Sequence, residues 1–360
     1  MPYPADYGGV IDVFYKLKAL KEDGYKVFLH CYHYGRKEQS ELENLAEKVY
    51  YYPRHAGRSR LFVRKPYIVA SRDSDMLLTR LQRDNYPILY EGLHCCHSID
   101  HKSLENRIKI VRAHNIEHDY YENLAEVESN VFKRYYFYNE ASKLKKYEKV
   151  LKKANYVAAI SPKDQMYFQK KYKKAVLVPA FHPYREVGSK TGRGDFVLYH
   201  GNLGVGENNE AALYLCKKVF PHIKHPVVIA GNKASQELKA EVEKLEHVKL
   251  ESPVGFEKLQ SLIRNAQVNV LPTFQATGIK LKLLAALYAG RHVVVNYPMV
   301  EGNGLEELCH LENNPMKMAH KINQLFSIDF TGSEIEERKE VLYSRYSNRA
   351  SLTSLKPLFV

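Results

Sequence analysis

Residues 268–290 read VNVLPTFQATGIKLKLLAALYAG, and this segment is the clearest indication of the fold. An apolar run at 268–271 is followed by a loop of small residues and then by an apolar segment with helical spacing over 279–289. A buried strand that leads through a short loop into a helix is the repeating unit of parallel α/β sheets. The segment therefore predicts a doubly wound α/β domain.

The same alternation of strand and helix extends in both directions along the chain. Strands are predicted at 27–32, 49–52, 88–90, 108–111, 157–160, 196–199, 227–230, 248–250, 268–271 and 293–295. Helices are predicted at 10–23, 208–219, 234–245, 256–265 and 279–289, and another opens at Ser161-Pro162. The stretch 179–194 is rich in Pro, Gly and charge, as linkers are. We therefore expect Rossmann-like domains over 1–185 and 186–332, and a polar helical segment over 333–360.

The start of the chain departs from the pattern of a doubly wound domain. Tyr7-Gly8-Gly9-Val10 has the composition of the loop that follows a first strand, but only six residues precede it. We therefore expect the first strand of the N-terminal domain to be missing, either from this sequence or because the true start lies upstream. Without that strand, the sheet would have a gap.

Composition excludes several classes of protein. The chain has 360 residues, of which 45% are hydrophobic and 26% are charged, so it is not intrinsically disordered. No window is long and apolar enough to span a bilayer, and the first residues do not form a signal peptide. The five cysteines form no C-x-x-C pair, which favours reduced thiols. We expect a cytoplasmic protein.

The net charge of +13 is unevenly distributed. Residues 1–180 carry 32 basic and 22 acidic side chains, and residues 133–174 alone carry 13 basic and three acidic ones with interleaved Tyr and Phe. Three interpretations of 133–174 are open: a solvated helical face with core aromatics, a surface for anionic lipid, or a nucleic-acid site. Nucleic acid is the least favoured because no nucleic-acid motif accompanies the charge. The lipid interpretation predicts peripheral contact with the inner face of the cytoplasmic membrane.

Ligands of open α/β sheets bind beyond the carboxyl ends of the strands, so the residues there are the candidates for a site. Gly8 and Gly9 open the first helix, and Gly201 and Asn202 follow the strand at 196–199. Lys280 and Lys282 lie in the first turn of a helix, where the helix dipole disfavours cations unless an anion compensates. A bound diphosphate would compensate. The alternative is that both lysines point into water.

Two further loops concentrate titratable groups. Residues 112–121, RAHNIEHDYY, follow the strand at 108–111, and a helix start with Asn115 as N-cap accounts for Glu117 but not for His114. Residues 91–101, EGLHCCHSIDH, could suggest a metal site. Adjacent cysteines do not match zinc spacing, however, so a strand-end loop that lines a ligand site is preferred.

These segments together resemble the retaining glycosyltransferases of the GT-B fold, in particular glycosyltransferase family 4, the glycosyl transferases group 1. The resemblance covers most of the chain and is carried by residues 4–9, 112–117, 154–161, 200–202, 208–211, 277–290 and 304–305. It implies two Rossmann-like domains facing each other across a cleft. It also implies a nucleotide-sugar donor in the C-terminal domain, an acceptor in the N-terminal domain, and a last helix that crosses back to the first domain.

The resemblance also implies roles for individual residues. His114 would position the sugar, and Lys280 and Lys282 would face the diphosphate. Other donor-binding residues would be Gly8, Gly9, Gly201, Asn202, Gly231, Val254, Phe256, Thr277, Gly278, Glu301, Gly304 and Leu305. The leaving diphosphate would be stabilised by lysines and helix amides, so neither a metal nor another cofactor is expected.

The sequence departs from the family pattern at two points. The family has a Glu-x7-Glu pattern ahead of the helix glycine that matches Gly290, but here the two positions hold Thr277 and Ala285. The basic residue expected after Gly201 is also absent, and Lys280 and Lys282 could replace it. Two hypotheses follow. One is a retaining hexosyltransferase for surface polysaccharide or glycoconjugate assembly, and the other is a non-catalytic or impaired relative that binds carbohydrate or a partner enzyme.

Overall fold

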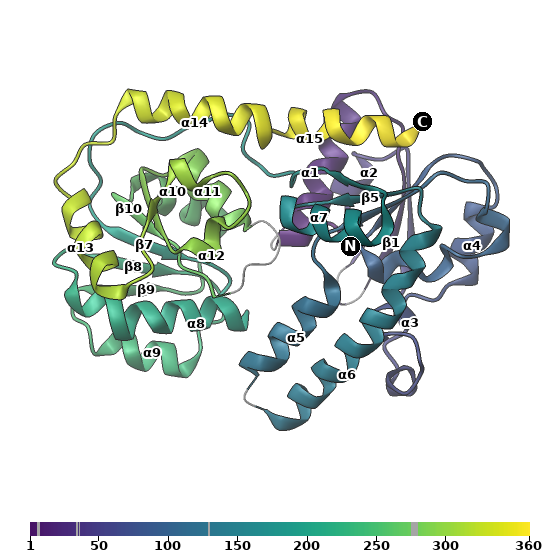
Figure 1. Cartoon of the computed structure of the whole chain (residues 1–360), viewed down its shortest axis with the longest axis horizontal. Helices are drawn as coiled ribbons and strands as arrows, with labels where there is room; N and C mark the ends of the chain where they lie inside the picture. Colours follow the sequence, from purple (N-terminus) through teal and green to yellow (C-terminus); the bar gives the residue numbers. More distant parts are fainter. Residues whose placement is uncertain (6–7, 34, 36, 129, 275–279) are drawn as a thin grey trace. The chain divides into compact units, whose positions relative to one another are not determined.

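The computed structural model describes residues 1–5, 8–33, 35, 37–128, 130–274 and 280–360 (Figure 1). The chain forms two compact units. The N-terminal unit comprises Met1–Pro183 and Arg345–Val360, and the C-terminal unit comprises Tyr184–Ala276 and Lys280–Ser344. The segment 333–360, expected as one piece, is therefore shared between the two units. Each unit is an α/β structure with parallel strands, which confirms the predicted fold class.

The N-terminal unit contains two separate parallel sheets. The first pairs β1 (Phe28–His33) with β2 (Lys48–Pro53), in a register that places Phe28 opposite Lys48. The second has the order β3 (Ile88–Glu91), β4 (Lys109–Ala113), β5 (Tyr156–Ala159) and β6 (Ala175–Leu177). Among the described residues, no strand joins β1 to β3, so the two sheets of this unit are separate.

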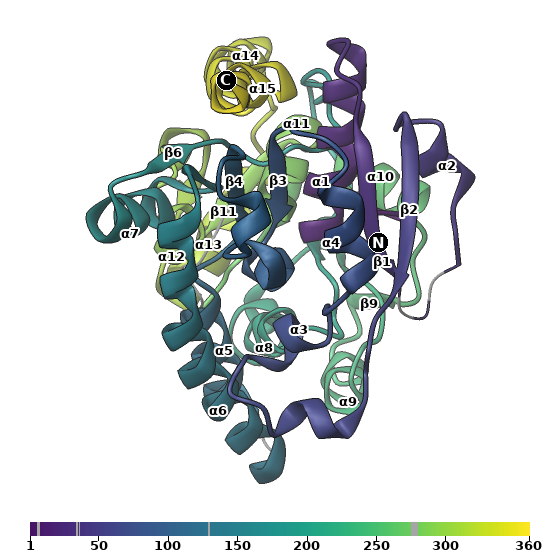
Figure 2. The same cartoon turned by 90° about the vertical axis from the view of Figure 1, so that its right-hand side faces the viewer.

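Helix α1 (Gly8–Glu22) packs against both sheets of the N-terminal unit, and Figure 2 shows it between the β1–β2 pair and β3. Phe14 and Leu17 pack with Cys31 of β1, whereas Ala19 and Leu20 pack in a core with β4 and β5. Helix α15 (Asn348–Leu355) contributes to that second core and lies beside α1 (Figure 1). One amphipathic helix therefore connects the two sheets.

The other helices of the N-terminal unit connect its strands. They are α2 (Ser40–Glu43), α3 (Tyr67–Ala70), α4 (Asp75–Leu81), α5 (Glu117–Val127), α6 (Val131–Tyr147) and α7 (Pro162–Tyr172). Ser161 caps α7 by accepting a hydrogen bond from the amide of Asp164, as Ser161-Pro162 predicts. Helices α5 and α6 pair as a projecting hairpin (Figure 1).

The C-terminal unit has one six-stranded parallel sheet with the order β12-β11-β10-β7-β8-β9. Its strands are β7 (Val197–His200), β8 (Val227–Ala230), β9 (Val248–Glu251), β10 (Val268–Val270), β11 (His292–Val295) and β12 (His310–Leu311). From β7, the chain builds the sheet first toward β9 and then, from β10, in the opposite direction. The switch point between β7 and β10 is where ligands bind in folds of this type.

Helices cover both faces of this sheet (Figure 1). They are α8 (Gly206–Tyr214), α9 (Gln236–Glu243), α10 (Phe256–Asn265), α11 (Leu281–Ala289), α12 (Tyr297–Val300), α13 (Pro315–Leu325) and α14 (Gly332–Arg345). The predicted helix over 208–219 is in fact α8 followed by a π-helical turn over Leu215–Val219. Within the described ranges, no helix is both long and apolar enough to cross a membrane.

Candidate functional site

In the C-terminal unit, the candidate site forms at the switch point of the sheet. Strands β7 and β10 are parallel neighbours, with Val268 opposite Val197, so their carboxyl ends meet at one edge. The loop after β7 leads into α8, and the loop after β10 leads toward α11. Residues 275–279 of the second loop, which include the predicted donor residues Thr277 and Gly278, lie outside the described residues.

Lys280 forms an ion pair that the sequence did not predict. Its Nζ lies 2.8 Å from Oε1 of Glu207, in the first turn of α8. The hydroxyl of Thr273, which follows β10, donates to the same carboxylate oxygen. Burial raises the pKa of Glu207, but Lys280 and Thr273 outweigh it and lower the pKa overall. An acidic residue therefore already neutralises Lys280, contrary to the picture of two uncompensated ammonium groups.

Lys282 has a different environment. Its Nζ donates to Oδ1 of Asn208 at 2.9 Å and lies 5.4 Å from the ring centroid of Tyr199. Within the described part of the chain, no carboxylate forms an ion pair with it. Burial lowers the pKa of Lys282 to about 8, although the charge of Glu207 opposes this shift. Lys282 is therefore a largely desolvated cation that has a neutral hydrogen-bond acceptor, Asn208, but no anionic partner among the described residues.

The loop after β7 holds Asn208 in position. The side-chain amide of Asn208 donates to the carbonyl of Asn202 at 3.1 Å while its oxygen accepts from Lys282. His200, at the end of β7, is buried, and its Nε2 has no hydrogen-bond partner among the described residues. Burial and the nearby charge of Lys282 lower the pKa of His200 to about 3, so it is neutral at physiological pH.

The remaining donor residues predicted in this unit lie in loops around the sheet. A Cβ on Gly231, just after β8, would overlap the carbonyl oxygen of Gly201, so this glycine permits the close approach of two loops. The amide of Val254 donates to Asn232, and Phe256 begins α10 with its ring 53% exposed.

The last three predicted donor residues, Glu301, Gly304 and Leu305, lie in a turn that follows α12. Glu301 ends that helix, and Gly304 adopts a φ of 68°, in the left-handed region that favours glycine. Leu305 is fully buried, and its amide donates to Asn303. These residues form a packed turn.

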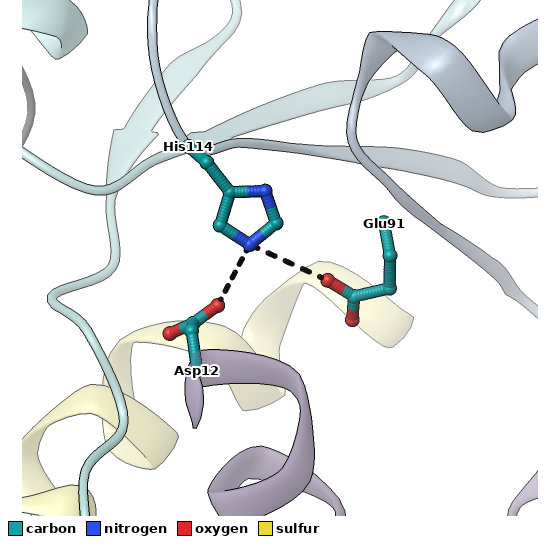
Figure 3. A group of neighbouring side chains, drawn as sticks. All are labelled: Asp12, Glu91 and His114. Carbon is teal, nitrogen blue, oxygen red and sulfur yellow. Dashed lines mark hydrogen bonds and ion pairs between the residues drawn. The ribbon is translucent and has the colours of Figure 1, made fainter. Parts of the chain in front are cut away.

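In the N-terminal unit, His114 lies against two carboxylates (Figure 3). Asp12 comes from α1, Glu91 ends β3, and His114 follows β4. The Nε2 atom of His114 is 3.1 Å from Oδ2 of Asp12 and 3.9 Å from Oε2 of Glu91. If Nε2 carries the proton toward Asp12, Nδ1 is left to accept a hydrogen bond from a substrate hydroxyl.

Asp12 is the centre of a buried charge network. Both of its oxygens accept from Arg112, at 2.8 and 3.0 Å, and Lys16 donates to it at 3.1 Å. The backbone amide of Phe181 also donates to it, at 2.8 Å. Burial raises the pKa of Asp12, but Arg112 and Lys16 lower it far more, so the carboxyl pKa lies well below its usual range. The network holds His114 in one orientation.

Asp12, Glu91 and His114 also have the spacing of a metal site, since their ligand atoms lie within 4.8 Å of one another. Lys16, however, bridges the two carboxylates, at 3.1 Å from Asp12 and 2.9 Å from Glu91. A divalent ion would have to displace that ammonium group and compete with Arg112. These residues therefore fit a fixed histidine better than a metal.

Two other predicted features of this unit are the glycines at the start of α1 and the 91–101 loop. Gly8 and Gly9 begin α1, and a Cβ on Gly9 would meet nothing within 4 Å, so packing of the described residues does not account for glycine there. The 91–101 loop forms a 3₁₀ helix over Leu93–Ser98, in which Cys96 is buried in the core. Among the described residues, neither Cys95 nor Cys96 belongs to a metal-type cluster.

Sequence reasoning missed Asp12, Lys16, Thr273 and the pairing role of Glu207. Asp12 and Lys16 have the i,i+4 spacing of a surface ion pair, and nothing in the sequence indicates that both are buried.

The basic-aromatic region 133–174 divides into two parts. Tyr147, Tyr167, Phe168 and Tyr172 pack in or against the core, whereas the first turns of α6 are exposed.

Comparisons with known proteins agree with this architecture. Residues 194–327 match the family model described as Glycosyl transferases group 1. A relative from Klebsiella pneumoniae, named "Uncharacterized 44.6 kDa protein in cps region", is 26% identical over 373 residues. That match covers 96% of this chain and 92% of the relative.

Several solved structures share the fold. A glycosyltransferase from Rickettsia africae has a TM-score of 0.67 at 13% identity, covering 98% of this chain and 94% of its own. Anabaena HepE, solved with UDP and glucose, has a TM-score of 0.64 at 11% identity, with coverage of 96% and 95%. S. aureus TarM, solved with fondaparinux, α-GlcNAc-glycerol and UDP, has a TM-score of 0.55 at 16% identity. That match covers 75% of this chain, which spans only about half (54%) of the length of TarM.

Proposed function

We propose that this chain, a glycosyltransferase of group 1 with the GT-B fold, is a retaining enzyme that moves a hexose from a nucleoside-diphosphate sugar to a sugar or lipid-linked acceptor. The observation that carries the proposal is Lys282, a partly buried cation at the switch point of the sheet with no acidic partner among the described residues. The UDP bound in HepE and TarM supports a nucleoside diphosphate as the ligand. The relative from the cps region supports a role in capsule or other surface-polysaccharide synthesis.

In this proposal, the C-terminal unit stabilises the leaving diphosphate. Lys282 and the positive end of the α11 dipole meet the negative charge that develops as the glycosidic bond breaks. Lys280 keeps two further N–H donors while it pairs with Glu207, so Glu207 positions Lys280 rather than removing it from the site. Cationic groups that bind the diphosphate more tightly in the transition state than in the ground state accelerate the reaction. In this proposal the lysines stabilise the leaving group without a metal ion.

The N-terminal unit is proposed to orient the sugar. His114, held through Nε2 by Asp12, offers Nδ1 as an acceptor for a sugar hydroxyl. An oxygen of the leaving diphosphate takes the proton of the attacking hydroxyl, so no enzyme carboxylate has to act as a nucleophile. The loss of the family carboxylates at Thr277 and Ala285 is compatible with this division of roles.

Donor binding tests the proposal directly. Calorimetry of the full chain with UDP, GDP, ADP and CDP is expected to show one-to-one binding of at least one of them. Turnover is then measured against the matching nucleotide sugars, and the anomeric configuration of the product is read by NMR. Absence of binding across the whole panel would reject the proposal.

One set of observations favours the second candidate, a non-catalytic relative that binds carbohydrate. Ala285 stands where the family has a carboxylate, and Glu207 already forms an ion pair with Lys280. The two functions differ in turnover. Diphosphate binding together with no sugar release from any donor, with or without simple acceptors, would favour the binding protein.

The pKa of Lys282 predicts how donor affinity depends on pH. With a pKa of about 8, Lys282 is protonated at pH 7 and becomes neutral above pH 8. The diphosphate group of UDP keeps its charge over this range, since its last phosphate pKa is about 6. Affinity for UDP should therefore fall as pH rises from 8 to 10, by up to about tenfold per unit. The matched control is Lys282→Arg, whose charge persists above pH 12. An equally steep loss in that variant would assign the dependence to another group.

We also propose that the tip of the α5–α6 hairpin contacts an anionic membrane surface, as a lipid-linked acceptor would require. Phe132 is 87% exposed, Tyr135 75% and Val131 70%, and Lys133 and Arg134 lie among them. Phe62 is 88% exposed in the basic loop 58–65, which α6 contacts where Lys143 donates to the carbonyl of Leu61. Exposed aromatic rings beside basic side chains are typical of interfacial helices.

Replacing both Phe132 and Tyr135 with serine should weaken binding to phosphatidylglycerol vesicles by at least about tenfold, because each ring loses apolar burial in the bilayer. Co-sedimentation measures it. The matched control is the double variant Met166→Ser with Ile328→Ser, which removes two exposed apolar side chains elsewhere. Equal vesicle binding by all three proteins would rule out this surface. Oligonucleotide binding that falls steeply with salt would instead support nucleic acid.

A further inference from the structure

A second group of imidazole and carboxylate side chains lines a cavity in the C-terminal unit, apart from the residues discussed above. A cavity of about 130 Å³ is lined by residues that include His292, His310, Glu307, Glu334, Glu337 and Arg338. His292 begins β11, His310 begins β12, and Glu334 lies in the first turn of α14. Three separate segments therefore supply imidazole and carboxylate groups to one cavity.

The two ring nitrogens of His292 differ in their hydrogen bonding within the described part of the chain. Its Nε2 lies 3.2 Å from the carbonyl oxygen of Ile328. A carbonyl can only accept, so Nε2 carries the hydrogen, and the neutral ring then has its lone pair on Nδ1. The side chain is only 2% exposed, and Nδ1 has no hydrogen-bond partner among the described residues. A buried acceptor without a donor calls for an explanation.

What faces Nδ1 is another acceptor. Oε1 of Glu334 lies 3.6 Å from it. A lone pair and a carboxylate at this distance repel each other unless a cation or a proton lies between them. Two ligand atoms on a tetrahedral zinc ion, each about 2.0–2.1 Å from the metal, are about 3.3 Å apart. The observed separation is therefore close to that of a metal-bridged pair. The backbone carbonyl on the other ring nitrogen is the usual outer partner of a metal-bound histidine.

His310 lies near this pair, although the three residues do not have the 4.8 Å ligand-atom spacing of the Asp12–Glu91–His114 group. Its ring centroid lies 5.7 Å from that of His292. Two imidazoles on one zinc ion have centroids roughly 5 Å apart, given the same metal–nitrogen distance. A small shift of the His310 ring would therefore complete the set. Cys309 also lines the cavity, but its thiol is not assigned as a ligand because two imidazoles and one carboxylate already match a zinc site with one open position.

The charge of the cavity also favours a cation. Three glutamates and one arginine among its lining residues give a net charge of −2 with neutral imidazoles. The guanidinium of Arg338 donates to the carbonyls of Leu287, Gly290 and Arg291. Because these bonds hold it in place, Arg338 does not neutralise all three carboxylates. Glu307 and Glu337 are exposed to solvent, so the carboxylate that a cation would balance inside the cavity is that of Glu334.

We propose that His292, His310 and Glu334 bind a divalent transition-metal ion, with Zn²⁺ as the ion that suits two imidazoles and one carboxylate. Three protein ligands leave a fourth position open, as in His₂Glu zinc sites. The ion would join β11 and β12 to α14. This role is independent of the proposed transfer reaction.

The test measures metal binding by the purified full chain after chelator treatment and buffer exchange. Competition with a chromophoric zinc chelator should give one equivalent of tightly bound Zn²⁺, and Co²⁺ should give the absorption of a four-coordinate site. His310→Asn and Glu334→Gln should each weaken Zn²⁺ binding by more than about 100-fold, since loss of even an outer partner costs 10- to 100-fold. Circular dichroism verifies that each variant is folded.

Two controls make the assignment specific. His320→Asn removes an exposed histidine of α13 and should leave Zn²⁺ affinity unchanged. His114→Asn tests the Asp12–Glu91–His114 cluster and should also leave it unchanged. Binding that survives both His310→Asn and Glu334→Gln, that is lost in His114→Asn, or that is absent from the wild-type protein would each overturn the proposal. In the last case, a proton shared by His292 and Glu334 would explain the geometry.

Discussion

Replacing Lys282 with methionine should lower kcat/KM for the nucleotide-sugar donor by about 10²–10³-fold, the usual effect of removing one group that stabilises a developing negative charge. Methionine preserves the apolar stem of lysine but removes the ammonium group. The thermal midpoint should stay level or rise, because burying the charge of Lys282 costs free energy, as its lowered pKa indicates. Initial rates over a range of donor concentrations and a thermal melt measure the two quantities.

Two comparisons separate the phosphate role of Lys282 from a general loss of charge. Lys280→Met leaves Glu207 without its ion-pair partner, so this variant should lose both diphosphate affinity and stability. Lys217→Met removes an exposed lysine that pairs with Glu237 and should change neither. If Lys282→Met keeps the donor affinity and rate of the wild-type chain, Lys282 does not contact the diphosphate and the proposed mechanism fails.

The donor site shows how far local sequence reasoning extends. Strand–helix alternation places Lys280 and Lys282 at the start of α11, and the helix-dipole argument marks them as a site. Glu207 lies in a different loop, and only the pairing of β10 with β7 brings it to Lys280. Spacing within one segment cannot reveal such a contact. The sequence around the two lysines therefore does not show that Lys280 has an anionic partner and that Lys282 has a neutral one.

The N-terminal unit repeats this lesson on the scale of a sheet. Its two parallel sheets are separate, and α1 packs against both of them. Strands β6 and β12 escape prediction because three and two residues are too short to show a hydrophobic period. Asp12 and Lys16 escape as buried residues because their partners, Arg112 and Glu91, come from strands far along the chain.

Replacing Asp12 with alanine should destabilise the chain by about 3–5 kcal/mol, the cost of removing one partner from a buried ion pair. Arg112 is fully buried, and the change would leave its guanidinium with only the carbonyls of Val178 and Pro179 as acceptors. Lys16 would keep only Glu91. Urea unfolding of the wild-type and variant chains measures the difference. Because the pKa of Asp12 is lowered on folding, this stabilisation is present above pH 4 and is lost as pH falls through the folded pKa.

The decisive control changes both partners of the pair together. In the double variant Asp12→Leu with Arg112→Met, no buried charge is left unpaired on that side, so stability should recover most of what Asp12→Ala loses. His114→Ala, at a partly exposed position, should cost much less than Asp12→Ala because its ring pairs with Asp12 from the edge of the network. A loss of stability below about 1 kcal/mol for Asp12→Ala would mean that water reaches Arg112. Only hydration of the guanidinium could replace the carboxylate at so small a cost in free energy. His114 would then have no fixed carboxylate behind it, and the proposed orientation of the sugar by Nδ1 would lose its structural basis.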